Sequence, residues 1–257
     1  MRESLNEKRE GAYHPITIAI RDLERIFRNL GFSVATGPEK ESEWYNFDAL
    51  NIPPNHPARD LWDTFWIDKN AGELLRTHTS PVQIRYMEKH SPAGGPIAII
   101  APGKTYRYEA TDATHEAQFY QIEGLLVGKD IHLGHLKGVL SKFLGDFYGT
   151  KADVRLRPSF FPFVEPGVEV DMTCFNCKKG EECSVCKGTG WIELMGAGMV
   201  HPKVLSNVGI DPKVFQGFAF GAGIDRLVML KYGIDDVRLF YGGDLRLTEQ
   251  FRAKSNL

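Results

Sequence analysis

Long apolar stretches are missing from this 257-residue sequence. Its longest apolar runs, such as PIAII, are far shorter than the roughly 20 residues that a membrane-spanning helix needs. The N-terminal MRESLNEKREGAY also lacks the apolar centre of a secretory signal. A large net charge is missing as well, because 31 Lys and Arg offset 33 Asp and Glu, which argues against a polybasic nucleic-acid binder. We therefore expect a cytoplasmic protein that does not interact with membranes.

Cysteine is scarce, and its four residues are concentrated in one short stretch, TCFNCKKGEECSVCKGTGW. Two CxxC pairs are formed by Cys174 with Cys177 and by Cys183 with Cys186. In a reducing compartment such pairs indicate metal ligands rather than disulfides, and four thiolates can close a tetrahedral zinc site. The alternative is a loop whose metal is optional or lost. A closed four-ligand site leaves no open position for a substrate, so the spacing favours a structural zinc over a catalytic one.

Internal repeats, low-complexity linkers and a βαβ rhythm are all absent, which favours one α+β domain over residues 1–257, with 1–13 as a lead-in. Apolar periodicity predicts helices over 15–30, 81–90, 130–148 and 224–232, with Ser80 and Asp130 as caps of the second and third. Between them, PIAII, KTYRYEA, AQFYQIEGLLV, ADVRLRPS, GVEVDM and WIELMGAGM are typical of antiparallel strands, and FSVAT of a short strand. The cysteine stretch, residues 173–190, is inserted between two of these strands.

The hairpin YRYEATDATHEAQFYQIEGLLV carries unusually varied polar chemistry. Because residues alternate between faces along a strand, Arg107 and Glu109 should point the same way, as should Phe119, Gln121 and Glu123. An arginine suits a phosphate, carboxylates suit an ammonium group, and an aromatic ring can stack on a base. The alternative is an ordinary solvated face of the sheet.

A second cluster, GFAFGAGIDRLVMLKYG, places Arg226 at the start of an apolar helix after several glycines. The pattern is compatible with nucleotide binding beside a helix N-terminus. It is equally compatible with close packing of strand against helix and a surface Arg226, because glycines alone are weak indicators.

Four segments together carry a specific family resemblance. YRYEATDATHEAQFYQIEG, FFPFVEPG, GAGMVHP and FAFGAGIDRLVMLKYG resemble the alpha subunit of bacterial phenylalanine–tRNA ligases, which are class II aminoacyl-tRNA synthetases. The similarity runs from about His14 to the C-terminus. It implies an antiparallel sheet flanked by helices, with the cysteine knuckle as an elaboration of one strand connection.

The resemblance also implies roles for residues in ATP binding. Arg107 matches the arginine that clamps the α-phosphate and the amino-acid carboxylate, and Glu109 lies beside it. His115 falls in the loop near the phosphates. Phe119 and Arg226 match the groups that cover the two faces of adenine, and Arg107, Arg226 and His115 form the implied catalytic set.

The implied phenylalanine site combines residues that hold the ammonium group with residues that pack on the ring. Its members are His78, Ser80, Gln121, Glu123, Phe161, Phe163 and Ala219, with Phe161 and Phe163 expected to share a face of one strand and Ala219 expected to be the floor. Glu165 matches a carboxylate that binds Mg²⁺ near the partner subunit.

The implied reaction joins L-phenylalanine to ATP as phenylalanyl-adenylate and then transfers it to tRNA(Phe), with Mg²⁺ and a beta subunit in an α2β2 assembly. Family members begin with a helical tRNA-binding arm, and only MRESLNEKREGAY precedes the catalytic part here, so no arm is expected. We expect apolar surface on residues 27–37 to pair subunits. Two alternatives remain open: an amino-acid-activating paralogue without tRNA charging, and a zinc-dependent interaction module.

Overall fold

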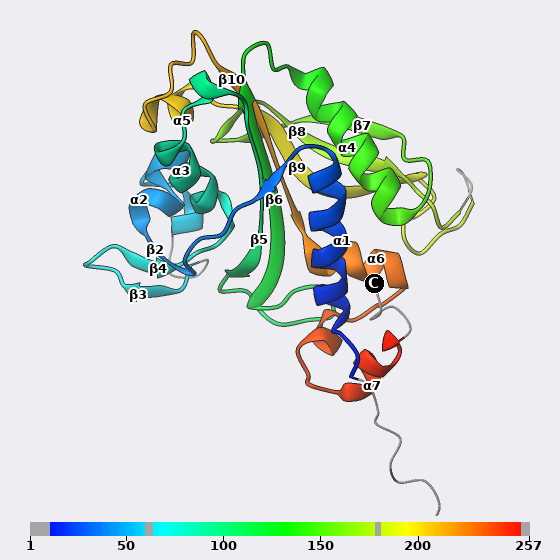
Figure 1. The fold of residues 1–257 in the computed structure, drawn as a ribbon. Helices are drawn as coiled ribbons and strands as arrows, with labels where there is room; N and C mark the ends of the chain where they lie inside the picture. Colours follow the sequence, from blue (N-terminus) through cyan, green and yellow to red (C-terminus); the bar gives the residue numbers. More distant parts are fainter. Residues whose placement is uncertain (1–10, 60–63, 178–180, 253–257) are drawn as a thin grey trace, which may run out of the picture.

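The structure, a computed structural model, describes residues 11–59, 64–177 and 181–252. A seven-stranded sheet runs through it in the order β1-β5-β6-β10-β9-β8-β7 (Figure 1). Its strands are β1 (Ser33–Val34), β5 (Ile97–Tyr106), β6 (Gln118–Gly128), β7 (Val154–Phe161), β8 (Val164–Thr173), β9 (Trp191–Val200) and β10 (Gln216–Gly223). The neighbours pair antiparallel except β1 and β5, which pair in parallel. The predicted α+β class is confirmed, and the parallel pair is an addition to it.

Helices and a small sheet surround the large sheet. The helices of the described ranges are α1 (Pro15–Asn29), α2 (Glu43–Asn46), α3 (Ser80–Lys89), α4 (Leu133–Tyr148), α5 (Pro202–Asn207), α6 (Ile224–Tyr232) and α7 (Leu245–Glu249). Short 3-10 turns are η1 (Asp48–Leu50), η2 (Pro57–Arg59), η3 (Pro92–Gly94) and η4 (Val237–Phe240). The small sheet has the order β2-β4-β3, from β2 (Lys40–Ser42), β3 (Trp66–Asp68) and β4 (Glu73–Leu75). None of these helices combines the length and apolarity that crossing a membrane requires.

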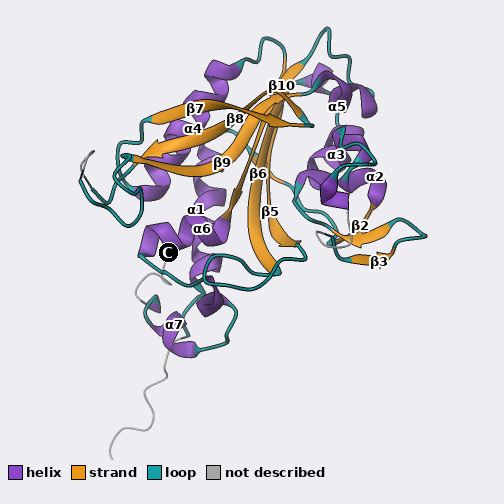
Figure 2. Ribbon diagram, turned by 180° about the vertical axis from the view of Figure 1, so that it is seen from behind, coloured by secondary structure: helices purple, strands orange, loops and turns teal. Residues whose placement is uncertain are grey.

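Helices α1, α4 and α6 cover one face of the large sheet (Figures 1 and 2). Phe27 of α1 packs 4.9 Å from Phe143 of α4 and 5.5 Å from Phe220 of β10, measured between ring centroids. Because side chains alternate along a strand, Phe220 on the helix side sends Ala219 and Gly221 to the opposite face. That opposite face is where polar residues of β6 and β10 can gather.

A second apolar cluster lies on the other face, at the β5–β6 end of the sheet. It contains side chains from η1, α3 and α5, including Leu50, Ile84 and Leu205, packed with Ile99 and Leu125 of the sheet. The clusters on the two faces therefore clamp β5 and β6 from both sides. The hairpin of polar residues is held on this rigid pair of strands.

The expected interruption between PIAII and KTYRYEA is wrong, because β5 is one continuous strand. β1 pairs with β5 only at Ile99 and Ile100, so the strand is an edge at Pro102, where a residue without an N–H is tolerated. The strand ends at Tyr106, one residue before Arg107. Arg107 and Glu109 are therefore loop residues, and alternation along a strand does not fix their direction.

Two further local expectations are corrected. Helix α4 is capped by His132, whose ring Nδ1 accepts from the Gly134 N–H, while Asp130 adopts a left-handed φ of 58° and takes no part in the cap. Phe27, Phe32 and Ala35 of residues 27–37 are buried in the chain's own core, which leaves less apolar surface on this segment than expected. Leu30 and Val34 of this segment are only half-buried, and its role in pairing subunits stays a prediction.

Candidate active site and thiol cluster

A cavity of about 680 Å³ opens on the sheet face opposite α1, α4 and α6. Its walls come from β6 and β10, from α3 with the residues before it, from residues 47–58, and from the turn that joins β7 to β8. Nine of the residues expected in the site line it: His78, Ser80, Arg107, Glu109, Gln121, Glu123, Phe161, Phe163 and Ala219. The structure thus brings together the expected amino-acid set and one arginine.

Glu123 is the polar centre of this cavity and is almost fully buried. Its carboxylate accepts four hydrogen bonds: from the Thr79 N–H (3.0 Å), the Ser80 hydroxyl (2.6 Å), Gln83 Nε2 (2.8 Å) and Gln121 Nε2 (3.0 Å). Burial raises the pKa of Glu123 to about 7, although the hydrogen bonds from Ser80 and Thr79 act in the opposite direction. A cation placed beside this carboxylate would favour its ionised form. The Ser80 hydroxyl thus donates to Glu123 and is not the expected helix cap.

Two buried groups in the cavity have unused hydrogen-bonding capacity. Among the described residues, neither ring nitrogen of His78 nor the Gln121 side-chain oxygen has a partner of good geometry. Burial lowers the pKa of His78 to about 3, and the nearby Arg107 charge acts in the same direction. His78 is therefore a neutral imidazole. Buried polar groups normally find partners, so a polar ligand in the cavity would supply hydrogen bonds to both groups.

Arg107 lies at the edge of the cavity, just beyond the end of β5. Its Nε donates to the Thr77 carbonyl oxygen (3.1 Å), and its guanidinium lies 5.1 Å from the centre of the Phe119 ring. Glu109 approaches it at 4.0 Å between Nη1 and Oε1. The Arg107 side chain remains 41% exposed, so its charge is available to an anion that enters the cavity.

Four expected site residues lie outside the cavity lining. His115 is exposed, and its Nδ1 pairs with Asp112. Arg226 is also exposed and donates from Nη2 to the Glu193 carbonyl oxygen (3.1 Å). Glu165 is exposed, and Phe119 lies under the Arg107 guanidinium. The adenine and magnesium roles of these residues therefore stay predictions.

The two phenylalanines of FFPF form one wall of the cavity, but not as neighbours on a strand. Phe161 is the last residue of β7, whereas Phe163 lies in the turn before β8. Their rings stack with centroids 6.0 Å apart and planes 20° apart. The expected shared strand face is thus wrong, because the turn rather than alternation brings the rings together. A Cβ on Gly196 would lie 3.0 Å from the Phe161 ring, so glycine there leaves room for it.

The four cysteines converge in the connection between β8 and β9, as expected, although residues 178–180 of the predicted knuckle lie outside the described residues. The sulfur–sulfur distances are 3.7 Å for Cys174–Cys177, 3.9 Å for Cys174–Cys183 and 3.4 Å for Cys177–Cys186. A tetrahedral site with Zn–S bonds of about 2.3 Å has sulfurs about 3.8 Å apart. All four are free thiols, so the donor set fits a zinc ion.

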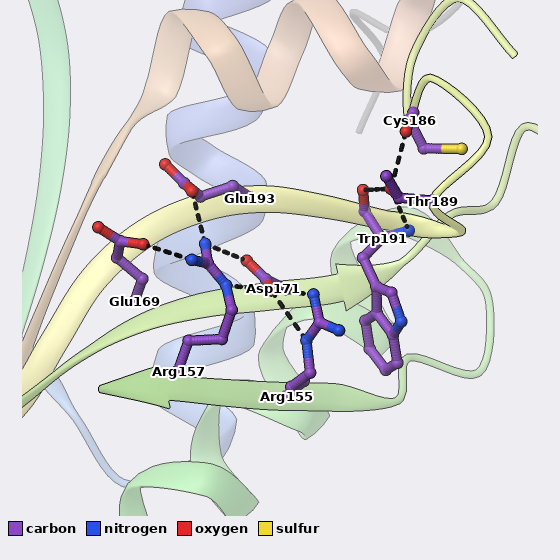
Figure 3. A network of polar contacts seen from close by, with 8 residues as sticks. All are labelled: Arg155, Arg157, Glu169, Asp171, Cys186, Thr189, Trp191 and Glu193. Carbon is purple, nitrogen blue, oxygen red and sulfur yellow. Dashed lines mark hydrogen bonds and ion pairs between the residues drawn. The ribbon is translucent and has the colours of Figure 1, made fainter. Parts of the chain in front are cut away.

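The thiol cluster is joined to the sheet through Thr189 and Trp191 (Figure 3). The Thr189 hydroxyl donates to the Cys186 carbonyl oxygen (2.7 Å) and accepts from the Trp191 N–H (3.2 Å). Trp191 is the first residue of β9, and the Arg155 guanidinium lies 4.4 Å above its ring. A metal that holds Cys186 would therefore also hold the start of β9.

A charged network that the sequence analysis missed spans β7, β8 and β9 (Figure 3). Asp171, with only 2% of its side chain exposed, pairs with Arg155 and Arg157 at 2.6 Å each. Burial opposes its ionisation, but the hydrogen bonds from Arg157 and Arg155 prevail and lower its pKa. Arg157 also reaches Glu193 (2.6 Å) and Glu169 (2.8 Å). The signal was available, because RxR, ExD and WxE place these residues at alternate positions of three strands.

Other missed residues lie in the cavity wall. Gln83 follows Ser80 by three positions and so shares its helix face, which could have pointed to it. Leu50, Ile52 and His56 of residues 47–58 also line the cavity. Their segment has no periodic pattern, so no signal in the sequence placed it there.

Comparison with known proteins is consistent with this geometry. The family model described as tRNA synthetases class II core domain (F) matches residues 3–251. The chain is 56% identical over 242 residues to the "Phenylalanine--tRNA ligase alpha subunit" of Bacillus subtilis (strain 168), covering 94% of this chain and 69% of that protein. It is also 56% identical over 246 residues to the protein of the same name from Dehalococcoides mccartyi (strain CBDB1), covering 94% of this chain and 70% of that protein.

Proposed function

The chain belongs to the class II tRNA synthetase core family, among the phenylalanine–tRNA ligase alpha subunits, and from this we propose how its cavity works. The protein catalyses the ATP-dependent joining of L-phenylalanine to tRNA(Phe). L-phenylalanine occupies the cavity, with its ammonium group at Glu123 and its ring against Phe161 and Phe163. ATP lies across the exposed edge formed by Arg107 and Phe119.

The observation that carries the proposal is the composition of the cavity around Glu123. A buried carboxylate with a raised pKa, a Gln121 oxygen without a partner among the described residues, and a neutral His78 form a polar end suited to an ammonium group. The stacked aromatic rings and Ala219 form an apolar end. An amino acid with an aromatic side chain has this same division between a charged end and an apolar end.

The first chemical step needs alignment and charge neutralisation rather than a covalent enzyme intermediate. The phenylalanine carboxylate is already ionised at neutral pH and attacks the α-phosphorus of ATP, releasing pyrophosphate. Arg107, at the edge of the cavity, neutralises charge that develops on the phosphate, while Glu123 orients the amino acid. Arg226 and His115, outside the cavity, are assigned to the more distant part of ATP. The adenylate then reacts with the 3′-terminal adenosine of the tRNA.

Magnesium would balance the charge of the triphosphate during this step. Glu165 is an exposed carboxylate, and within the described ranges the cysteines are the only group of three or more potential metal-binding side chains. A Mg²⁺ ion at Glu165 would therefore take its other ligands from phosphate oxygens, water or a partner subunit, which agrees with how this ion usually binds.

The test of the proposed function is ATP–pyrophosphate exchange measured against all amino acids, followed by charging of tRNA(Phe). We expect phenylalanine to support exchange. Charging should need a beta subunit in an α2β2 assembly, which we expect to work in the cytoplasm. Exchange with another amino acid alone would refute the substrate. Exchange with phenylalanine but no charging in the assembled complex would favour the amino-acid-activating paralogue.

Phenylalanine binding is expected to weaken as the pH falls below about 7. The pKa of Glu123 is raised to about 7, so below this value the carboxyl group is increasingly protonated and must lose its proton to pair with the ammonium group. We expect Kd for phenylalanine to rise by up to about tenfold per pH unit on the acid side, because one proton is released on binding. Calorimetric titration from pH 5.5 to 8.5 measures Kd for phenylalanine at each pH.

Glu123→Gln is the matched control, because it keeps the shape of the side chain and cannot ionise. Its phenylalanine affinity should be low and independent of pH over this range. An equally steep pH dependence in the Gln variant would show that another group is responsible.

We propose that Cys174, Cys177, Cys183 and Cys186 bind one zinc ion that stabilises the β8–β9 connection. The fit of the sulfur spacing to a tetrahedral site supports it. Removal of the metal by a chelator should lower Tm and leave phenylalanine exchange intact in protein that stays folded, because the cavity lining contains none of the cysteines. Native mass spectrometry and thermal melts measure the two effects. Metal-free protein with four free thiols and an unchanged Tm would refute the proposal.

A further inference from the structure

Asn51 stands between two residues of the cavity wall, Leu50 and Ile52. It ends the 3-10 turn η1 in the left-handed region, with φ 60° and ψ 22°. Asparagine is one of the few residues with a side chain that adopts this conformation at low cost. Its side chain is directed across the cavity wall, where Nδ2 donates to the Pro162 carbonyl oxygen at 2.7 Å.

Pro162 is the centre of the turn that carries the stacked rings of Phe161 and Phe163. A proline has no N–H, so the turn can be held at this residue only through its carbonyl group. On the far side of the turn, the Phe163 carbonyl oxygen accepts from the His201 N–H (2.9 Å). The bond from Asn51 therefore joins two cavity walls that are 111 residues apart in sequence.

The aromatic wall lies at the outer strand of the large sheet. β7 is the last strand in the sheet order, so within the described part of the chain it has a paired neighbour, β8, on one side only. Its pairing with β8 is also irregular between Ser159 and Phe161. A strand end with an unpaired outer edge and shifted register can move more easily than the centre of the sheet. The hydrogen bond from Asn51 to Pro162 and the one from His201 to Phe163 then fix the turn that carries the rings.

We propose that Asn51 is a positioning residue that sets the width of the aromatic end of the cavity and thereby the selectivity for phenylalanine. This rests on the proposed function, in which Phe161 and Phe163 contact the substrate ring. Asn51 does not need to touch the substrate itself. It acts by holding Pro162, so its loss should affect the amino acid and its ring substituents but not ATP.

The test uses two variants of Asn51 in the chain assembled with its beta subunit. Asn51→Gly keeps the left-handed backbone without strain and removes only the amide. Asn51→Asp keeps the shape but places a carboxylate oxygen against the Pro162 carbonyl, where both atoms are acceptors.

We expect KM for phenylalanine in ATP–pyrophosphate exchange to rise about threefold to tenfold in the Gly variant, the range for one lost hydrogen bond, and further in the Asp variant. KM for ATP should stay within about twofold, since the wall at Pro162 is not assigned to ATP.

Selectivity is the readout that a merely structural role would not change. The ratio of kcat/KM for para-chlorophenylalanine to that for phenylalanine should rise at least about threefold in Asn51→Gly, because a wall free to move outward accepts the larger ring. Asn207→Ala is the matched control. Asn207 donates to the Ala49 carbonyl oxygen (3.1 Å) in the same segment but makes no bond to the turn, so its variant should keep both the ratio and KM for phenylalanine.

Three results would overturn the proposal. An Asn51→Gly enzyme with an unchanged KM for phenylalanine and an unchanged kcat/KM ratio of the two amino acids shows that the bond does not set the width of the cavity. Equal rises in KM for phenylalanine and ATP, matched by Asn207→Ala, show that Asn51 only supports folding. A wild-type complex that does not exchange with phenylalanine overturns the proposed function, and this proposal with it, so the two failures are distinguished by the wild-type assay.

Discussion

Replacement of Arg107 by alanine is expected to reduce kcat/KM for phenylalanine-dependent ATP–pyrophosphate exchange by at least about a hundredfold. Loss of one preorganised charge donor typically costs about 3 kcal/mol of transition-state stabilisation. The Nε of Arg107 donates to the Thr77 carbonyl oxygen, which fixes the guanidinium at the cavity edge, where 41% of the side chain is exposed. Steady-state exchange kinetics with varied ATP and phenylalanine measure the loss.

Arg155→Ala is the matched control for this experiment. Arg155 also lies over an aromatic ring, that of Trp191, but it is outside the cavity lining. Its variant should keep exchange near the wild-type rate and change stability at most. Near-normal exchange by Arg107→Ala, or an equal loss in both variants, would refute the role assigned to Arg107.

Replacement of Ala219 should change which aromatic amino acids are accepted. Ala219 lies on β10 opposite Gly198 and lines the cavity, and we expect it to be the floor of the slot for the ring. Glycine at this position removes one methyl group, so kcat/KM for para-chlorophenylalanine should rise while exchange with phenylalanine changes little. Valine adds two methyl groups to a packed slot and should reduce kcat/KM for phenylalanine about tenfold or more, since overpacking typically costs about 1–3 kcal/mol. Exchange rates with both amino acids measure this.

Ala222→Gly provides the comparison on the same strand. Ala222 points to the opposite face of the sheet and is buried among the helices. Its variant should lose stability without gaining activity on the para-substituted ring. If Ala219→Gly gains no more than Ala222→Gly, Ala219 is not the floor of the slot.

Short-range patterns in the sequence predicted much of this molecule. The helix from Pro15 follows from its apolar period and from proline in its first turn, both of which depend on neighbouring residues. Gln121 and Glu123 fall on one strand face because alternation is a property of the backbone. The two CxxC pairs lie close enough in sequence to suggest their own cluster. Each of these inferences involves residues within about 15 positions of one another.

The tertiary structure decided what surrounds those residues. Glu123 receives two of its four hydrogen bonds from Ser80 and Gln83, which are 43 and 40 residues away, and no local pattern encodes that meeting. The same holds for Asn51, whose contact with the aromatic turn depends on where the end of η1 lies relative to Pro162. Local propensities act through the backbone and neighbouring side chains, whereas these contacts form only when the whole sheet and its helices are assembled. The sequence alone therefore determined the chemistry available, and only the packing of distant segments determined the shape and polarity of the cavity in which that chemistry is placed.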